Sequence, residues 1–280
     1  MKLHTVHTGN FKLDGGAMFG VVPKTLWQKT NPSDSNNLCT WAMRCLLIED
    51  GEKLILIDNG IGDKQDEKFL AHYHLHGDDS LESSLKKLGF SRDDVTDVIL
   101  THLHFDHCGG SIIRQKDQLI PAFKNAIYWS NEAHWHWATK PNDREKASFL
   151  TENILPIMES GQLKMIPAEN NYQFSNDIHL RFVSGHTESM MLPQISYLGN
   201  QVVFMADLLP SAGHLPIPYI MAYDTRPLNS MEEKKTFLQE AEKNKYILFF
   251  EHDPVVECCT VKLTEKGIRL NETFRLTDLD

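Results

Sequence analysis

The stretch "LTHLHFDHCGG" (Leu100–Gly110) carries, within six residues, four side chains that can bind a metal: His102, His104, Asp106 and His107. The apolar segment "TDVILTH" leads into it and predicts a buried strand. In an extended segment, side chains at positions i and i+2 lie on one face, so His102 and His104 can point at the same position. Two imidazoles leave the coordination shell of a metal incomplete. The rest of the chain must therefore supply further ligands.

We expect the chain to turn after these two histidines, because Gly109 and Gly110 give the backbone unusual conformational freedom. Asp106 and His107 would then point at a second position next to the first. Imidazole nitrogen and carboxylate oxygen suit zinc best, with Mn²⁺ or Fe²⁺ as alternatives. The motif therefore predicts half of a site for two metal ions.

Four other predicted strands also end in a residue that can bind a metal or orient a ligand: Asp58 after "LILI", His186 after "RFVSG", Asp207 after "VVFMA" and His252 after "ILFFE". Each follows an apolar strand whose backbone is held by the core, as a preorganised metal site requires. The two carboxylate oxygens of Asp207 could bridge two ions. These strand ends predict the missing ligands.

The length, charge and cysteine content of the chain favour a soluble single-domain protein that binds neither nucleic acid nor membrane. With 280 residues, no internal repeat and no long linker, the chain is expected to form a single domain over residues 1–280. A net charge of −10 argues against nucleic-acid or anionic-membrane partners, because both require a basic surface. We see no signal peptide and no apolar run of the ~18 residues that span a bilayer. The five cysteines include no C-x-x-C pair, which favours reduced thiols and a cytoplasmic location.

Mixed strands and helices predict an α/β protein whose sheets are covered by helices. Strands are expected at 2–13, 40–50, 52–60, 96–102, 124–130, 162–168, 178–184, 193–199, 201–207, 246–253, 259–267 and 268–276. A helix at 79–89 has a capping box at Asp79/Glu82 and a C-terminal Gly89, and a helical stretch at 131–160 is broken near Pro141. A capping box at Ser230/Glu233 is expected to open an amphipathic surface helix at 231–244.

In order and spacing, Asp58, H-x-H-x-D-H, G-H-T, A-D and the late E-H-D resemble the metallo-β-lactamase superfamily. The flanking stretches "DGGAMFGVVPKTLW" and "HLPIPYIMAYDTRP" resemble its branch of probable quorum-quenching lactonases, which open N-acyl-homoserine lactones. The resemblance implies an αββα sandwich with two mixed sheets covered by helices. It also implies two metal ions per chain with these ligands: His102, His104 and His186 for the first, Asp106, His107 and His252 for the second, and Asp207 bridging both. In this pattern Asp58 orients a ligand without binding the metal.

The implied reaction is attack of a hydroxide that bridges the two ions on a lactone carbonyl, since two zinc ions about 3.5–4 Å apart lower the pKa of a shared water toward ~7. Asp106 is the candidate that moves the proton to the leaving alkoxide. We expect Met18 and Phe19 to form part of the wall for the acyl chain, with His214 and Tyr223 near the substrate headgroup. The chain departs from the family pattern at "GHTESM", at Ala206 and at Pro210, where related lactonases carry a tyrosine that acts on the carbonyl.

Three other features have simpler explanations. "HYHLH" (residues 72–76) lies among charged residues and is expected to be a solvated loop or a dimer contact. In "AHWHWA", His134 and His136 would diverge on a helix, because side chains at i and i+2 do not face each other, so packing or a pocket wall is favoured over metal binding. Cys108 is expected to be a small buried thiol.

Other functions remain open at this point. Within the same superfamily, a phosphotriesterase or a thioesterase would use the same metals on another substrate. A catalytically silent metal-binding protein on this fold is the alternative from another class. The partner we expect is a small lactone or ester, and a homodimer is compatible with the sequence.

Overall fold

The computed structural model describes residues 1–279, and its contacts divide the chain into two compact units. Unit 1 comprises Met1–Asn10 and Met43–Ala168; unit 2 comprises Phe11–Ala42 and the chain from Glu169 onward. Two long strands, β1 (Lys2–Asp14) and β2 (Leu38–Asp50), run from one unit into the other. The single domain over residues 1–280 stays a prediction.

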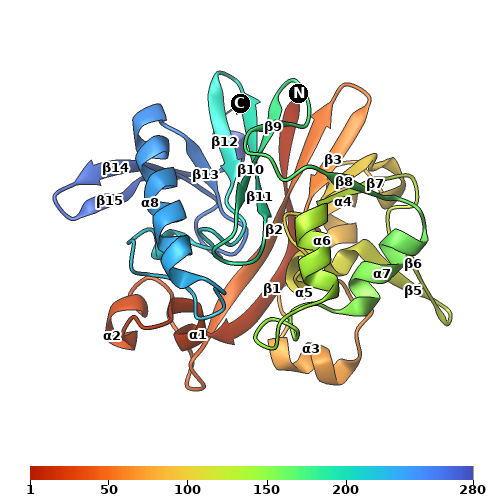
Figure 1. Cartoon of the computed structure of the whole chain (residues 1–280), viewed down its shortest axis with the longest axis horizontal. Helices are drawn as coiled ribbons and strands as arrows, with labels where there is room; N and C mark the ends of the chain where they lie inside the picture. Colours follow the sequence, from red (N-terminus) through yellow and green to blue (C-terminus); the bar gives the residue numbers. More distant parts are fainter. Residues whose placement is uncertain (280) are drawn as a thin grey trace. The chain divides into compact units, whose positions relative to one another are not determined.

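Unit 1 is built on a mixed sheet with the strand order β1-β2-β3-β4-β7-β8 (Figure 1). Its remaining strands are β3 (Lys53–Ile57), β4 (Asp97–Ile99), β7 (Ile127–Asn131) and β8 (Leu163–Ile166). β3 is antiparallel to β2, whereas the pairs β3–β4, β4–β7 and β7–β8 are parallel. Because parallel strands end at the same edge of a sheet, Asp58 and the metal-binding motif both emerge at the edge where β3 and β4 end.

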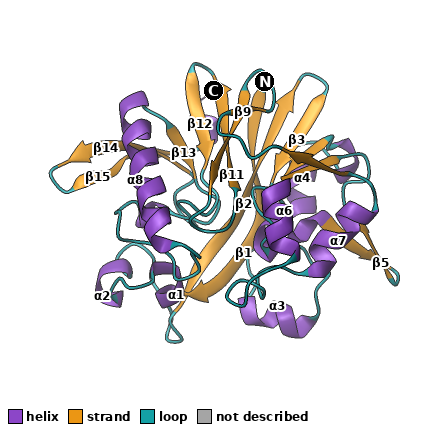
Figure 2. Cartoon of the chain, viewed as in Figure 1, coloured by secondary structure: helices purple, strands orange, loops and turns teal. Residues whose placement is uncertain are grey.

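Short helices and one hairpin complete unit 1 (Figure 2). They are α3 (Glu67–Tyr73), α4 (Leu81–Lys87), η1 (Arg92–Asp94), α5 (Phe105–Cys108), η2 (Gly109–Ser111), the hairpin β5 (Ile112–Gln115) with β6 (Gln118–Pro121), α6 (Glu132–Thr139) and α7 (Thr151–Glu159). The break predicted near Pro141 is confirmed, because α6 ends before it and α7 begins after it.

The predicted capping box of α4 was wrong by one residue. Ser80, not Asp79, precedes the helix, and its Oγ accepts a hydrogen bond of 3.1 Å from the backbone N–H of Ser83. Ser83 Oγ accepts in return from Ser80 N at 2.9 Å. Both serine and aspartate cap helices well, so the sequence did not separate them. Gly89 has a φ of +87°, which confirms the predicted left-handed end.

Unit 2 is built on a second mixed sheet with the order β15-β14-β13-β12-β11-β10-β9, in which only β12 and β13 are parallel. Its strands are β9 (Tyr172–Gln173), β10 (Ile178–Val183), β11 (Met190–Tyr197), β12 (Asn200–Phe204), β13 (Ile247–Phe249), β14 (Cys258–Thr264) and β15 (Gly267–Phe274). Its helices are α1 (Gly15–Phe19), α2 (Lys24–Trp27), η3 (Ala212–His214), α8 (Pro227–Asn244) and η4 (Leu276–Leu279).

Helix α8 begins three residues earlier than the proposed cap, with Pro227 at its start, a position that proline favours. Ser230 and Glu233 therefore lie inside the helix, and the predicted capping box was wrong. The helix is amphipathic, as predicted, with Phe237, Leu238 and Ala241 on its buried face, but Lys234 is fully buried as well. Among residues 1–279, no helix is long and apolar enough to cross a membrane.

The core of unit 1 holds the metal-binding motif in place. Leu100, Leu103 and Cys108 belong to its buried cluster, so apolar side chains alternate with the candidate ligands and anchor the segment. Cys108 is fully buried, which confirms the prediction of a small buried thiol, and this burial raises the pKa of the thiol to about 12. The ligands are thus presented by backbone that the core fixes.

Candidate metal centre

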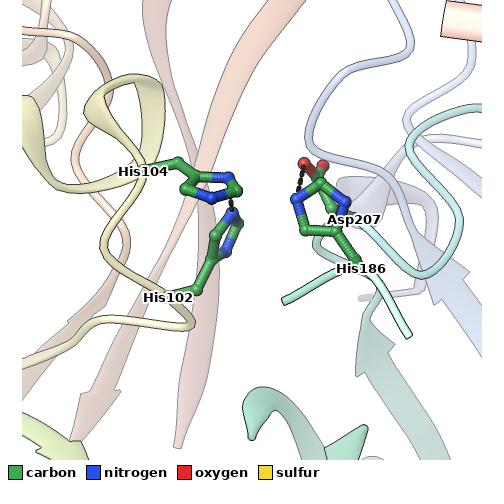
Figure 3. A group of neighbouring side chains, drawn as sticks. All are labelled: His102, His104, His186 and Asp207. Carbon is green, nitrogen blue, oxygen red and sulfur yellow. Dashed lines mark hydrogen bonds and ion pairs between the residues drawn. The ribbon is translucent and has the colours of Figure 1, made fainter. Parts of the chain in front are cut away.

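The first pair of ligands lies where β4 continues as extended chain. His102 Nε2 and His104 Nδ1 are 3.1 Å apart, so two imidazoles present nitrogens at one position, as the i, i+2 spacing predicts (Figure 3). The opposite nitrogen of each ring faces a protein oxygen: His102 Nδ1 lies 3.1 Å from Thr101 Oγ1, and His104 Nε2 lies 3.1 Å from Glu145 Oε1. Both rings are buried, and these outer contacts fix their orientation.

The second pair lies on α5, after the predicted turn. His107 Nε2 is 3.8 Å from Asp106 Oδ2, and His107 Nδ1 is 3.1 Å from Asp58 Oδ2. Thr101 holds Asp58 by donating from its backbone N–H at 2.8 Å and from its hydroxyl at 2.6 Å. Asp58 thus contacts the outer nitrogen of His107, which is the geometry expected of a residue that orients a ligand.

The two glycines of the motif have a different role from the predicted one. Gly109 has a φ of −60° and needs no left-handed conformation. A Cβ on Gly109 would instead lie 2.1 Å from the carbonyl oxygen of Ile61, and one on Gly110 would lie 2.2 Å from that of Asn59. Glycine is required here because the segment after β3 packs directly against this backbone, not because the chain needs freedom to turn.

Unit 2 contains the other three candidate ligands, centred on one carboxylate. Asp207 Oδ2 lies 3.1 Å from His186 Nε2, and Asp207 Oδ1 lies 3.2 Å from His252 Nε2 (Figure 3 shows the first pair). The outer nitrogens are again held, His186 Nδ1 by Asp224 Oδ1 at 2.9 Å and His252 Nδ1 by the Ala42 carbonyl at 2.8 Å. One oxygen of Asp207 thus faces each histidine, as a bridging carboxylate would.

The charges around His186 favour a cation. Burial alone would lower the pKa of this imidazole, but the carboxylates of Asp207 and Asp224 outweigh it and raise the pKa to about 10. The same negative charge would favour a divalent cation beside this ring.

Residues that sequence reasoning missed hold the loop before His186. The carboxylate of Glu233 accepts hydrogen bonds from the backbone N–H groups of Ser184 and Gly185 at 2.8 and 2.9 Å. Arg226 donates to the Ser184 carbonyl at 2.6 Å and pairs with Glu188 at 2.7 Å. The loop is therefore held by α8 and by the residue that precedes this helix.

The four candidate substrate residues all lie in unit 2. The rings of Phe19 and His214 stack with centroids 4.3 Å apart, and His214 Nε2 lies 2.8 Å from the Met18 carbonyl oxygen. His214 Nδ1 lies 2.8 Å from Ser211 Oγ, so both ring nitrogens have protein partners. Burial lowers the pKa of His214 to about 3, which keeps the ring neutral. These contacts favour a structural role for His214; the side chain of Tyr223 is exposed, and the substrate assignments stay predictions.

The two remaining histidine clusters differ in environment. His72, His74 and His76 are exposed, as predicted for a solvated segment, but His72 lies in α3 and not in a loop. In contrast, His134 is fully buried, and its Nε2 accepts a hydrogen bond of 2.8 Å from the backbone N–H of Leu103. His134 therefore holds the backbone of the metal-binding motif at Leu103 and is not one of the proposed ligands.

The donor chemistry fits metal ions. Within unit 1 the ligand atoms of His102 and His104, and those of Asp106 and His107, lie within 4.8 Å of each other. Within unit 2 the same holds for His186 and Asp207. Imidazole nitrogens and carboxylate oxygens, buried and oriented through their outer atoms, are the ligands that zinc, manganese and iron share.

Comparison with known proteins gives a consistent result. Residues 44–252 match the family model of the metallo-beta-lactamase superfamily. An N-acyl homoserine lactonase of Bacillus cereus is 26% identical over 265 residues, which cover 90% of this chain and 93% of that protein. AiiA, an N-acyl homoserine lactonase of Bacillus thuringiensis subsp. kurstaki, is 23% identical over 265 residues, which again cover 90% of this chain and 93% of that protein.

Solved structures extend the comparison to nearly the whole chain. A probable metal-dependent hydrolase from Staphylococcus aureus has a TM-score of 0.86 and 29% identity, with 98% of each chain covered. AidC, a dizinc quorum-quenching lactonase solved with N-hexanoyl-L-homoserine, has a TM-score of 0.78 and 24% identity, with 97% of this chain and 94% of that chain covered. The predicted αββα fold class is confirmed.

Proposed function

We propose that this chain, which belongs to the metallo-β-lactamase superfamily, is a metal-dependent lactonase. Its substrates would be N-acyl-homoserine lactones or similar lactones. The observation that carries the proposal is the ligand geometry within each unit, where oriented imidazoles face a second donor at 3.1 to 3.2 Å. The choice of lactones as substrates rests on relatives that are N-acyl homoserine lactonases and whose sequence similarity extends over 90% of this chain.

The proposed centre would hold two zinc ions, with Mn²⁺ or Fe²⁺ as alternatives. His102, His104 and His186 would hold the first, Asp106, His107 and His252 would hold the second, and Asp207 would contribute to both. Support comes from the position of Asp207, whose two oxygens face different histidines. Asp58 and Asp224 support the assignment because each contacts the outer nitrogen of a proposed ligand.

When bound, the metal ions would supply an activated water at neutral pH and a Lewis acid for the substrate carbonyl. The chain supplies the remaining functions. Asp106 keeps slight exposure, unlike the fully buried His107 beside it, and we propose that it carries a proton to the leaving alkoxide. Met18 and Phe19 are proposed to support the wall for the acyl chain, and Tyr223 to meet the headgroup. A cytoplasmic location and a homodimer remain predictions.

The test is a panel of substrates for protein loaded with zinc: N-hexanoyl-homoserine lactone, a plain γ-lactone, paraoxon and a thioester. We expect kcat/KM for the homoserine lactone to exceed kcat/KM for the other three substrates. Ring opening is measured through the proton that it releases, and we expect EDTA to abolish it. Activity confined to paraoxon or to the thioester would instead identify the protein as a phosphotriesterase or a thioesterase. Bound metal without hydrolysis of any substrate would indicate a binding protein.

A further inference from the structure

We propose that a brace on α6, formed by His134, Trp137 and the neighbouring Glu145, sets the orientation of His104 and of the backbone beside it. Glu145 is its positioning residue. The inference rests on the proposed function, because it takes His104 to be a metal ligand. It gives a role to the segment "AHWHWA", which the metal site itself does not use.

The carboxylate of Glu145 is the centre of the brace. Glu145 lies between α6 and α7 with only 3% of its surface exposed. Its Oε2 accepts hydrogen bonds from Trp137 Nε1 at 2.6 Å and from Asn142 Nδ2 at 3.0 Å. Its Oε1 lies 3.1 Å from His104 Nε2. Two donors from its own segment therefore fix the carboxylate, and its other oxygen points at the imidazole.

This contact determines which nitrogen of His104 is presented to a metal. An ionised carboxylate only accepts hydrogen bonds, so His104 Nε2 carries the proton and Nδ1 carries the lone pair. Nδ1 is the atom that lies 3.1 Å from His102 Nε2. Histidine ligands bind metals more strongly when a carboxylate accepts from their outer N–H. Glu145 thus selects the tautomer that the proposed site requires.

His134 holds the backbone between the two ligands. Its Nε2 accepts from the N–H of Leu103, the residue between His102 and His104. His134 and Trp137 are three residues apart on α6, so their side chains lie on one face of the helix. One helix face thus supports the motif twice, through the backbone at Leu103 and through Glu145 at His104.

The test compares metal release from the zinc-loaded wild-type protein and from Glu145→Gln, using competition with a chromogenic chelator. Glutamine keeps the shape but has one acceptor oxygen, so it cannot serve all the donors that the carboxylate serves. We expect one of the two ions to bind roughly 10–100-fold more weakly and the other to be unchanged. A residue that merely stabilised the fold would weaken both ions together.

His136→Ala is the matched control, because His136 lies exposed on the same helix and should leave both ions unchanged. Trp137→Phe, which removes the indole N–H that donates to Glu145, should produce a smaller shift of the same ion and serves if Glu145→Gln does not fold. The ¹⁵N shifts of the His104 ring should report a proton on Nε2 in the wild type. Two tightly bound ions in both variants, or equal weakening of both ions, would overturn the brace alone. Wild-type protein without metal would overturn the proposed function and the brace with it.

Discussion

Replacing Lys234 by methionine should change how the stability of the protein depends on pH. Its ammonium is buried in unit 2 and donates to the carbonyl oxygens of His214, Pro216 and Tyr219 at 3.0, 3.1 and 2.8 Å. Burial lowers the pKa of Lys234 from 10.5 to about 7, with the charge of Asp224 opposing part of that shift. Methionine is an unbranched side chain one atom shorter than lysine, and it removes the titration.

The sign and size of the effect follow from the two pKa values. Below pH 7 both the folded and unfolded chains carry the ammonium, and the cost of burying it is fully present. Between about 7 and 10.5 the unfolded chain binds more protons than the folded chain, so stability rises with pH. At about 1.4 kcal/mol per pH unit, partly offset near each pKa, the wild-type protein gains roughly 3 kcal/mol from this group between ~pH 6 and ~pH 9.

The assay is urea unfolding of wild-type protein and Lys234→Met at these two pH values. Other titrating groups are common to both proteins and cancel in the difference. The free energy of unfolding of the wild type, relative to the variant, should be higher at the alkaline pH by about 3 kcal/mol. An equal difference at both pH values would show that Lys234 does not titrate with a lowered pKa in the folded protein, as would a change of opposite sign.

Two further predictions concern the support of the metal ligands. Gly109→Ala should destabilise the protein by about 3 kcal/mol or more, because its Cβ would lie 2.1 Å from the Ile61 carbonyl oxygen. Gly161→Ala, with nothing within 4 Å but a φ of +77°, should cost only about 1 kcal/mol in the same urea titration. Asp224→Asn should weaken zinc binding roughly 10–100-fold in chelator competition, since the charge beside His186 Nδ1 is lost. Unchanged affinity would remove Asp224 from the site.

The parts of the site that are local in sequence were predictable. Period-two alternation places Leu103 in the core and His102 and His104 on the opposite face, and the structure confirms that arrangement. Polar residues at the ends of apolar strands likewise identified Asp207 and His252, which contact each other within unit 2.

The residues that sequence reasoning missed act over long separations. Glu145 contacts a histidine 41 positions away, and Glu233 accepts from backbone N–H groups 48 and 49 positions away. No local pattern marks such contacts, because they depend on how elements pack. The backbone of Ala206 was also not predictable from the sequence. Its φ of +41° is a strained conformation that glycine adopts more readily than alanine.

The bridged centre is tested most directly by the metal content of the zinc-reconstituted protein, measured by mass spectrometry of the metal per mole of chain. We expect about two ions for the wild type, about one for His102→Ala, and loss of both for Asp207→Ala, because one oxygen of Asp207 faces each of His186 and His252. Wild-type protein that binds no zinc, or an Asp207→Ala variant that retains both ions, would contradict the proposed bridged centre.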